Sequence, residues 1–161
     1  MNKIVVKDNL FDEEEIKNIY NFCRELSYKR NETDDVKLPY TGLVHNFNLE
    51  NSVVRTIIKK TELSYKNLTR AYVNLFLQKE EPFFHQDSVD KNSKTLLYYV
   101  NNEPQKIDDL GETFFYINNE VKGVQPVPGR VIIFDGEIWH RASSLRNYDR
   151  FTIALKWENI L

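Results

Sequence analysis

Near the start of the chain, apolar residues recur at the spacing of an α-helix. Ile16, Ile19 and Cys23 are separated by three and four residues, so they fall on one side of a helix. Asp12 precedes this stretch, and Glu15 follows Asp12 at the spacing of a capping box. The pattern predicts a helix that begins after Asp12, with Cys23 as a small buried hydrophobic residue on its apolar stripe.

A second amphipathic stretch predicts a helix over about Asn51 to Glu62, with Val54 and Ile57 among the residues that face inward. The segment between the two helices, Asp34–Asn48, shows no helical periodicity. It contains a proline, a glycine and two aromatic residues, which leaves a short strand pair and an ordered loop as alternatives. The same segment is the candidate for a substrate lid, and its His45 is expected to be a solvated loop histidine.

From Leu68 onward the period changes to two, which is the repeat of a β-strand. Tyr72, Asn74 and Phe76 fall on one face of the first strand, and Val73 and its apolar neighbours fall on the other. Further strands are expected at Thr95–Val100, Glu112–Ile117, Val121–Val127, Arg130–Phe134, Ile138–Ser143 and Arg150–Trp157.

Residues that favour chain reversals separate these strands. Asn118-Asn119 is typical of a tight hairpin, because asparagine tolerates a positive φ. Pro128-Gly129 and Asp135-Gly136 mark further turns. About eight short strands with turns this close predict a mainly β fold with N-terminal helices, built on a double-stranded β-helix, or jelly-roll, core.

The composition limits the size of the fold and the kind of partner. The 161 residues suit a single domain, so we expect 1–161 to be one unit, with 1–67 as helical support and a candidate lid and 68–157 as the jelly-roll core. The formal charge of -2 gives no electrostatic reason to expect a nucleic-acid or membrane partner. A single cysteine, no signal-peptide pattern and no apolar run of membrane length predict a cytoplasmic protein.

Two of the three histidines stand where a metal site could use them. His85 and Asp87 follow Pro82-Phe83-Phe84 near the end of an expected strand, where residues i and i+2 point to the same face. They can therefore bind one ion together, with His140 of a later strand as the third ligand. Two imidazoles and one carboxylate on one side of a metal leave other positions open, which is typical of Fe(II) oxygenases. A His-x-Asp pair also occurs by chance, and a strand histidine is more often a core residue. The residues around these three must therefore show whether they are metal ligands.

A further polar residue begins an otherwise apolar strand, Arg150–Trp157. An arginine in such a strand is costly to bury unless it meets an anion, and its planar guanidinium suits a carboxylate. Thr152 shares its face and could donate to the same anion. A turn over Leu145–Asp149 is expected to bring this strand antiparallel beside the strand of His140. The alternative is an exposed arginine at a strand end, and the neighbouring triad favours the ligand interpretation.

These residues together resemble a known family. His85-x-Asp87, His140 and Arg150-x-Thr152, in this order, are similar to the signature of the Fe(II)/2-oxoglutarate-dependent dioxygenases. Within that superfamily the chain most resembles the prolyl 4-hydroxylase-like branch. The resemblance covers 68–157, the whole of the expected core.

Segments between the signature residues also match. Leu96–Asn101 resembles the aromatic strand that follows the first two ligands in prolyl hydroxylases. Leu110–Phe115 resembles their Gly-Gly-Glu-Thr segment, with Leu110 in place of the first glycine. Pro128–Phe134 is similar to the turn and strand that lead to the distal histidine. Several matches in the same order make the resemblance specific.

The resemblance implies a role for each matched residue. The three ligands named above would hold Fe(II), and Arg150 would pair with the distal carboxylate of the cosubstrate 2-oxoglutarate. Thr152 matches the small hydroxyl position of that site. Tyr99 matches a tyrosine that hydrogen-bonds the same carboxylate, and Tyr98 takes this role if the register differs by one residue.

The implied activity is hydroxylation of a C–H bond, most of all in a peptidyl proline, with dioxygen as the oxidant and release of succinate and CO2. A free amino acid or another small metabolite is the alternative substrate. An alternative from another class is a non-catalytic jelly-roll module that binds a metal or ligand. Nucleic-acid demethylation is disfavoured, because the spacing of Arg146 and Arg150 does not match the doubled arginine pattern of the branch that performs it.

Overall fold

The computed structural model describes residues 4–30, 38–104 and 106–158 of the chain. Within these ranges the chain forms two helices and nine strands. In chain order they are β1 (Ile4–Lys7), α1 (Glu13–Arg24), β2 (Leu43–Asn46), α2 (Ser52–Thr61), β3 (Leu68–Phe76), β4 (Lys94–Tyr99), β5 (Thr113–Ile117), β6 (Glu120–Val124), β7 (Val131–Asp135), β8 (Trp139–Ala142) and β9 (Arg150–Trp157).

Both predicted helices are present, and side chains cap them. The Asp12 carboxylate accepts a hydrogen bond from the Glu15 backbone N–H at 2.8 Å, and the Glu15 carboxylate accepts one from the Asp12 N–H at 2.9 Å. This reciprocal pair is the predicted capping box at the start of α1. At α2 the Asn51 side chain accepts from the Val53 N–H at 2.9 Å, and Glu62 ends the helix with a left-handed φ of 59°.

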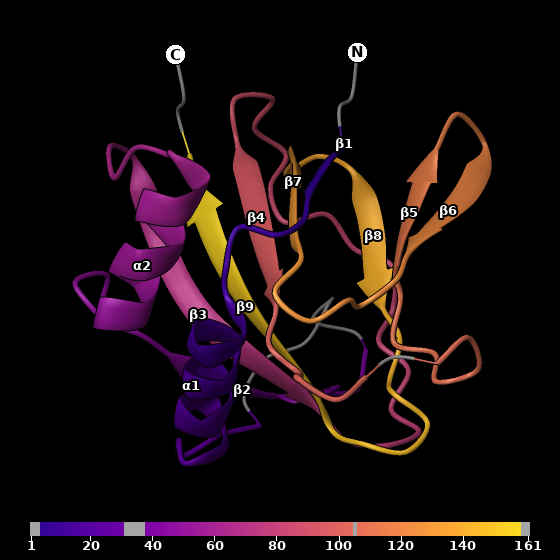
Figure 1. Ribbon diagram of the computed structural model, residues 1–161. Helices are drawn as coiled ribbons and strands as arrows, with labels where there is room; N and C mark the ends of the chain where they lie inside the picture. Colours follow the sequence, from indigo (N-terminus) through magenta and orange to yellow (C-terminus); the bar gives the residue numbers. More distant parts are fainter. Residues whose placement is uncertain (1–3, 31–37, 105, 159–161) are drawn as a thin grey trace.

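The strands form two antiparallel sheets (Figure 1). The major sheet has the order β1-β7-β4-β9-β3-β2, and the minor sheet has the order β6-β5-β8. Helices α1 and α2 lie against the face of the major sheet that points away from the minor sheet (Figure 1). The expected jelly-roll core with N-terminal helices is therefore confirmed.

Two apolar layers hold this arrangement together. The outer layer joins the helices to the major sheet and includes Cys23, Ile57 and Ile153. The inner layer lies between the sheets and includes Ile132 and Phe115. Strand alternation sends successive residues of the major sheet into different layers, which explains why its central strands are apolar on both faces.

The hairpin between β5 and β6 follows the predicted turn. Asn118 and Asn119 have φ angles of 53° and 62°, and Ile117 pairs with Glu120 across the turn. Both asparagines therefore adopt the left-handed conformation that a two-residue hairpin loop requires. In the described part of the chain, no helix is long and apolar enough to cross a bilayer.

The predicted neighbour of the last strand was wrong. β9 pairs with β3 and β4 in the major sheet, whereas β8 pairs with β5 in the minor sheet. The connection between β8 and β9 crosses from one sheet to the other. Leu145 forms an isolated bridge with Leu110, and the Arg146 N–H donates to the Asp109 carbonyl at 2.9 Å. These contacts bind the connection to the segment before β5, so it cannot close a hairpin.

The N-terminal part of the chain also contributes to the major sheet. β1 pairs with β7 at one edge, and β2 pairs with β3 at the other. Residues 34–37 of the candidate lid lie outside the described residues. In the described remainder, one strand, β2, forms, and it pairs with β3 outside the segment rather than within a strand pair of its own. Val44 also bridges to Lys29. The placement of His45 in a solvated loop was wrong: it is a partly buried residue of β2, and its Nδ1 lies 2.8 Å from the Ser27 carbonyl.

Candidate metal centre and anion pocket

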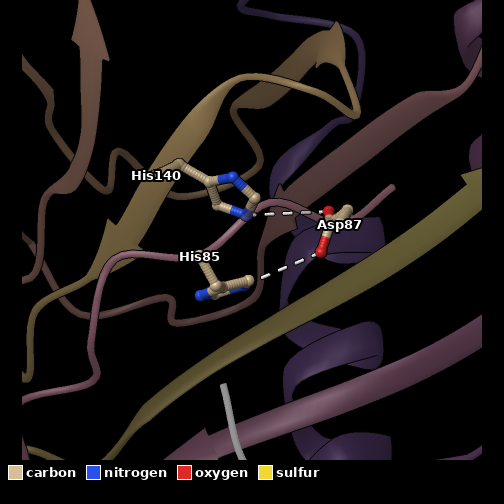
Figure 2. Close-up of side chains that lie close together, drawn as sticks. All are labelled: His85, Asp87 and His140. Atoms are coloured by element: carbon tan, nitrogen blue, oxygen red, sulfur yellow. Dashed lines mark ion pairs between the residues drawn. The ribbon is translucent and has the colours of Figure 1, made fainter. Parts of the chain in front are cut away.

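The structure brings His85, Asp87 and His140 together (Figure 2). One potential ligand atom from each residue lies within 4.8 Å of the others. The His85 Nε2 atom is 3.7 Å from one carboxylate oxygen of Asp87, and the His140 Nε2 atom is 3.6 Å from the other. Figure 2 shows the imidazole rings on one side of the carboxylate. The three residues that the sequence predicts as metal ligands are therefore close enough to share one ion.

Backbone pairing, rather than a long strand, positions the first two of these residues. β3 ends at Phe76, so His85 does not lie at the end of that strand as expected. His85 instead forms an isolated antiparallel bridge with His140, with N–H to O distances of 3.0 and 2.9 Å in the two directions. The Asp87 N–H donates to the Gly136 carbonyl at 2.9 Å. The His85–Asp87 segment is thereby fixed beside β8 and the turn before it.

The backbone also determines which nitrogen of each histidine is available. The His85 Nδ1 atom lies 3.1 Å from the Phe83 carbonyl, and the His140 Nδ1 atom lies 2.8 Å from the Ile138 carbonyl. A carbonyl can only accept, so each Nδ1 carries the proton of this hydrogen bond. The Nε2 atom of each ring therefore faces Asp87, and in the neutral form of the ring it carries the lone pair through which histidine binds a metal.

Asp87 is a buried carboxylate with a donor on each oxygen. The Thr95 hydroxyl donates to Oδ2 at 2.6 Å, and the Lys156 ammonium lies 2.8 Å from Oδ1. Burial alone would raise the pKa of Asp87, but its contacts with His140, His85 and Lys156 outweigh burial and hold that pKa well below the ordinary value. The carboxylate is therefore ionised, as a metal ligand must be.

His140 is held as a neutral imidazole by its apolar surroundings. Its ring centroid lies 4.7 Å from that of Phe134 and 6.1 Å from that of Phe115. Burial lowers the pKa of His140 from 6.5 to about 4, although the nearby Asp87 carboxylate acts in the opposite direction. At neutral pH the ring is therefore uncharged and can donate its lone pair to a cation.

Arg150 is the largest fully buried side chain in the described part of the chain, with 1% of its surface exposed. Its Nε–H donates to the Gly111 carbonyl at 2.9 Å, and an Nη2 N–H donates to the Thr113 hydroxyl at 3.0 Å. The rings of Phe76 and Tyr99 lie 5.8 and 5.4 Å from the guanidinium carbon. Both hydrogen-bond partners are neutral, and no described carboxylate forms an ion pair with Arg150. Burial accordingly lowers the pKa of the guanidinium.

The two tyrosines of β4 point to opposite faces of the sheet, because side chains alternate along a strand. The Tyr99 hydroxyl lies 2.7 Å from the Thr113 hydroxyl, on the side of Arg150. Tyr98 faces the helices instead, with its ring centroid 4.8 Å from that of Phe11. Of the two alternatives, only Tyr99 is beside the arginine, and Thr152 lines the same cavity as Arg150.

Two adjoining cavities extend from the His85–Asp87–His140 cluster. The arginine pocket is lined by Arg150 and Thr152, and the lysine cavity, of about 260 Å³, is lined by Lys156. His85 and Asp87 line both cavities, so each one reaches the same group of candidate ligands. An anion in the arginine pocket and a second molecule in the lysine cavity could therefore meet at one ion.

Sequence reasoning missed three polar residues of this region. Lys156 continues the i, i+2 face that begins with Arg150 and Thr152, so the alternation contained the signal for it. Thr95 and Thr113 each begin or nearly begin a strand and contact a predicted site residue. No feature of the sequence distinguishes Thr95 from an ordinary strand residue, because its partner comes from another element. Thr113 is the threonine of the segment that resembles Gly-Gly-Glu-Thr, so that motif contained a signal for it.

No protein-family model matches the chain, and no curated protein matches it. Solved structures with the same fold do match. A prolyl-4-hydroxylase of Pseudomonas putida superposes with a TM-score of 0.75 at 12% identity, over 99% of this chain and 94% of that one. A prolyl hydroxylase of Trichoplax adhaerens, solved with a hypoxia inducible factor peptide fragment, has a TM-score of 0.74 at 14% identity, over 98% of this chain and 84% of that one.

A viral collagen prolyl hydroxylase is also similar. The enzyme of Paramecium Bursaria Chlorella virus-1, solved as a 2-oxoglutarate complex, has a TM-score of 0.69 at 20% identity, over 96% of this chain and 94% of that one. The chain therefore has the fold of the prolyl hydroxylases among the Fe(II)/2-oxoglutarate oxygenases, as the resemblance of its motifs implied. At these identities the likeness establishes the fold, and the chemistry depends on the residues of the site.

Proposed function

We propose that the protein is an Fe(II)- and 2-oxoglutarate-dependent dioxygenase that hydroxylates a C–H bond. The observation that supports this proposal most strongly is that a candidate cation site, at Asp87, and a candidate anion site, at Arg150, lie beside the same cavity. The ionised Asp87, the neutral imidazole of His140 and the ring of His85 converge beside a cavity that ends at Arg150. A cation at the first site and an anion at the second would complete both.

The donor set fits Fe(II). Two histidine nitrogens and one carboxylate oxygen on one side of an ion form the facial arrangement of non-haem Fe(II) oxygenases, which leaves positions for other ligands. A structural zinc site usually closes with four protein ligands, often cysteines, and Cys23 is buried in the outer apolar layer instead. The proposed ligands are therefore His85, Asp87 and His140.

Arg150 fits the distal carboxylate of 2-oxoglutarate. A fully buried guanidinium with neutral partners retains a net charge that a carboxylate can balance through paired hydrogen bonds. Thr152 lines the pocket and can donate to the same carboxylate, while Tyr99 supports the arginine from the side. The pocket reaches the metal centre, so one dicarboxylate could bind both charged sites.

When bound, iron and 2-oxoglutarate supply the oxidant: one oxygen atom of O2 enters the substrate as a hydroxyl group, and the other enters succinate as CO2 leaves. The chain supplies position and environment. Asp87 and the histidines hold the cation, and Arg150 fixes the orientation of the cosubstrate. The aromatic residues around Arg150 and His140 keep water from the reacting groups.

For the substrate we propose a peptidyl proline, on the basis of the fold that the chain shares with prolyl hydroxylases from three sources. The second candidate is a free amino acid or another small metabolite. Lys156 favours it, because an ammonium group in a cavity of about 260 Å³ beside the metal centre suits a small acid.

The first test is the binding of Fe(II) and 2-oxoglutarate without oxygen. We expect a weak visible charge-transfer band when both are present, and succinate after air is admitted. Asp87→Ala should abolish both signals, because the carboxylate is the only charged ligand of the proposed site. Absorption spectroscopy and mass spectrometry of succinate provide the measurements.

A matched control is Asp135→Ala, which removes a carboxylate that pairs with Lys94 at 2.6 Å at the end of β7. Because Asp135 is not among the proposed ligands, this variant should keep the band and the succinate. A wild-type protein that gives neither signal would contradict the dioxygenase proposal and favour a non-catalytic binding module.

A further inference from the structure

Lys156 is a cation on the inner face of β9, next to the metal centre. It follows Arg150, Thr152 and Ala154 at intervals of two residues, so all four lie on the same face of the strand. Its side chain is 21% exposed, and it lines the lysine cavity of about 260 Å³. The proposed roles of Fe(II) and 2-oxoglutarate do not use this residue.

The contacts of Lys156 tie it to the centre. Its Nζ atom lies 2.8 Å from Asp87 Oδ1 and 5.3 Å from the centre of the Tyr72 ring. Asp87 is the only carboxylate among the described residues that line the cavity. The charge of Lys156 is therefore balanced, in this structure, by the residue that we assign as a metal ligand.

Binding of a divalent cation changes this balance. The charge of Asp87 and one carboxylate of 2-oxoglutarate together neutralise the cation, and Arg150 neutralises the other carboxylate. Lys156 then has no remaining negative charge to pair with among the groups assigned to the site. An ammonium that is largely removed from water is costly without a counter-ion. The loaded site thus requires one more negative charge in the lysine cavity.

A second cation lies across from Lys156. Arg70 of β3 is its direct partner in the strand register, and both residues line the lysine cavity. The Arg70 guanidinium donates to the Asn46 side-chain oxygen at 2.8 Å and lies 4.1 Å from the centre of the Tyr72 ring. Two cationic side chains, one from each of two adjacent strands, therefore line this cavity.

From this arrangement we infer that Lys156 binds a carboxylate of the molecule that is oxidised, so the substrate is an acid whose reacting carbon lies within a few bonds of its carboxylate. The inference rests on the proposed function and specifies its substrate class. A free amino acid and a peptide with a C-terminal carboxylate both provide this chemistry. An internal peptidyl proline does not.

The test compares acids with their amides on the loaded protein. The protein is saturated with Mn(II) and 2-oxoglutarate without oxygen, and binding is measured as paramagnetic relaxation of ligand protons. The probes are the free amino acids, the N-acetylglycyl derivatives of the same amino acids, and the C-terminal amide of each. We expect at least one acid to bind about tenfold or more tightly than its amide, since a hydrogen bond to a charged group is lost in the amide. The free and the N-acetylglycyl acids separate the two sources of the carboxylate.

Variants assign the preference to Lys156. Lys156→Met should abolish the difference between acid and amide, whereas Lys156→Arg should retain most of it. The control is Lys94→Met, which removes another lysine that is paired with an aspartate but does not line the cavity. The control should bind acids like the wild type. If Lys156→Met does not fold, the preference for acids over amides is compared between the wild type and Lys156→Arg. That comparison still tests whether the charge at position 156 binds the carboxylate.

The outcomes separate this inference from the proposed function. If the wild type fails to bind Mn(II) and 2-oxoglutarate, the proposed function fails. If it binds both but no acid is preferred over its amide, only the inference fails. It also fails if Lys156→Met weakens Mn(II) or 2-oxoglutarate binding while the acid preference persists, because Lys156 then only positions Asp87 or holds the cosubstrate.

Discussion

The aromatic rings around His140 set the charge of this residue and thereby its chemistry. The same imidazole on the surface would be partly protonated near neutral pH and would compete poorly for a cation. Contact with Phe134 and Phe115 removes water from the ring, and the Ile138 carbonyl fixes its proton on Nδ1. Burial therefore keeps this imidazole neutral and able to bind a cation, although it makes stability sensitive to acid.

The metal-free protein should lose stability as the pH falls from about 7 to about 5. In the unfolded chain His140 takes up a proton near pH 6.5, whereas in the folded protein it does so only near pH 4. Between these values the unfolded state binds more protons, so the free energy of unfolding falls by about 2 kcal/mol. Asp87 does not contribute in this window, because its lowered pKa makes its contribution fall only in stronger acid. Urea unfolding at the two pH values measures the difference, and His140→Gln should reduce it. An unchanged difference in that variant would show that other groups cause it.

Alternation along the last strand and the resemblance of the motifs singled out five residues that the structure brings together. His85, Asp87, His140, Arg150 and Thr152 all line the arginine pocket. The contacts of Asp87 with Thr95 and Lys156 were not predictable in the same way. They join residues from separate elements, and no local pattern states which strands become neighbours.

At the scale of elements, the turn before β5 supports Arg150. Gly111 has a φ of 89°, and its carbonyl accepts from the Arg150 Nε–H. A Cβ atom at Gly111 would lie 2.5 Å from Leu145 Cδ2, and Leu145 is fully buried. Leu110, which stands where the related motif has a glycine, also has a positive φ, of 62°. The backbone of this turn therefore has the shape that the glycine pair would favour.

Gly111→Ala should destabilise the protein by about 2–4 kcal/mol, because it combines an unfavourable φ with a clash in a packed region. It should also weaken 2-oxoglutarate binding through the displaced carbonyl. Gly123→Ala is the control: this glycine is exposed on β6, and we expect a change within about 1 kcal/mol. Chemical denaturation gives both values. Equal effects of the two variants would contradict the role assigned to the turn.

Helices and strands were predicted correctly where the hydrophobic periodicity was strong. The prediction failed where an element depends on which strand it pairs with. The helices and the strands from Leu68 to Trp157 were expected, with ends that differ by a few residues. β1 was not expected, because its four residues carry no turn signal and gain their order from pairing with β7. The wrong neighbour of β9 has a similar cause, since the Leu110–Leu145 bridge that directs the crossing joins distant segments.

At the scale of the whole molecule, the site joins parts that are otherwise held by apolar contacts. His140 belongs to the minor sheet and Arg150 to the major sheet, although only nine residues separate them in the chain. The crossing between β8 and β9 makes this possible. A metal with 2-oxoglutarate would connect the two sheets through charged groups, in addition to the inner apolar layer.

Ligands should therefore stabilise the folded molecule stepwise. With each ligand at about 100 times its dissociation constant, Mn(II) should raise the free energy of unfolding by about 2.7 kcal/mol, and 2-oxoglutarate should add a similar amount. In Arg150→Ala the Mn(II) increment should persist and the 2-oxoglutarate increment should largely disappear. Thermal unfolding is measured with and without each ligand, and the increment is the difference between the two for the same variant. The effect of the substitution on the unliganded protein then cancels. A full 2-oxoglutarate increment in this variant would show that the cosubstrate is anchored elsewhere.

The apolar residues of β4 affect how accurately this strand aligns with its neighbours during folding. Its residues Leu96 to Tyr99 are apolar toward both layers, so a shift of one residue would still bury apolar side chains on both faces. Hydrophobicity alone therefore specifies the alignment of this central strand weakly. The bonds from Thr95 to Asp87 and between Tyr99 and Thr113 exist in one alignment only. The polar groups of the site thus also select the correct pairing as the sheet assembles, and loss of the Thr95 hydroxyl would affect the fidelity of folding as well as the proposed metal centre.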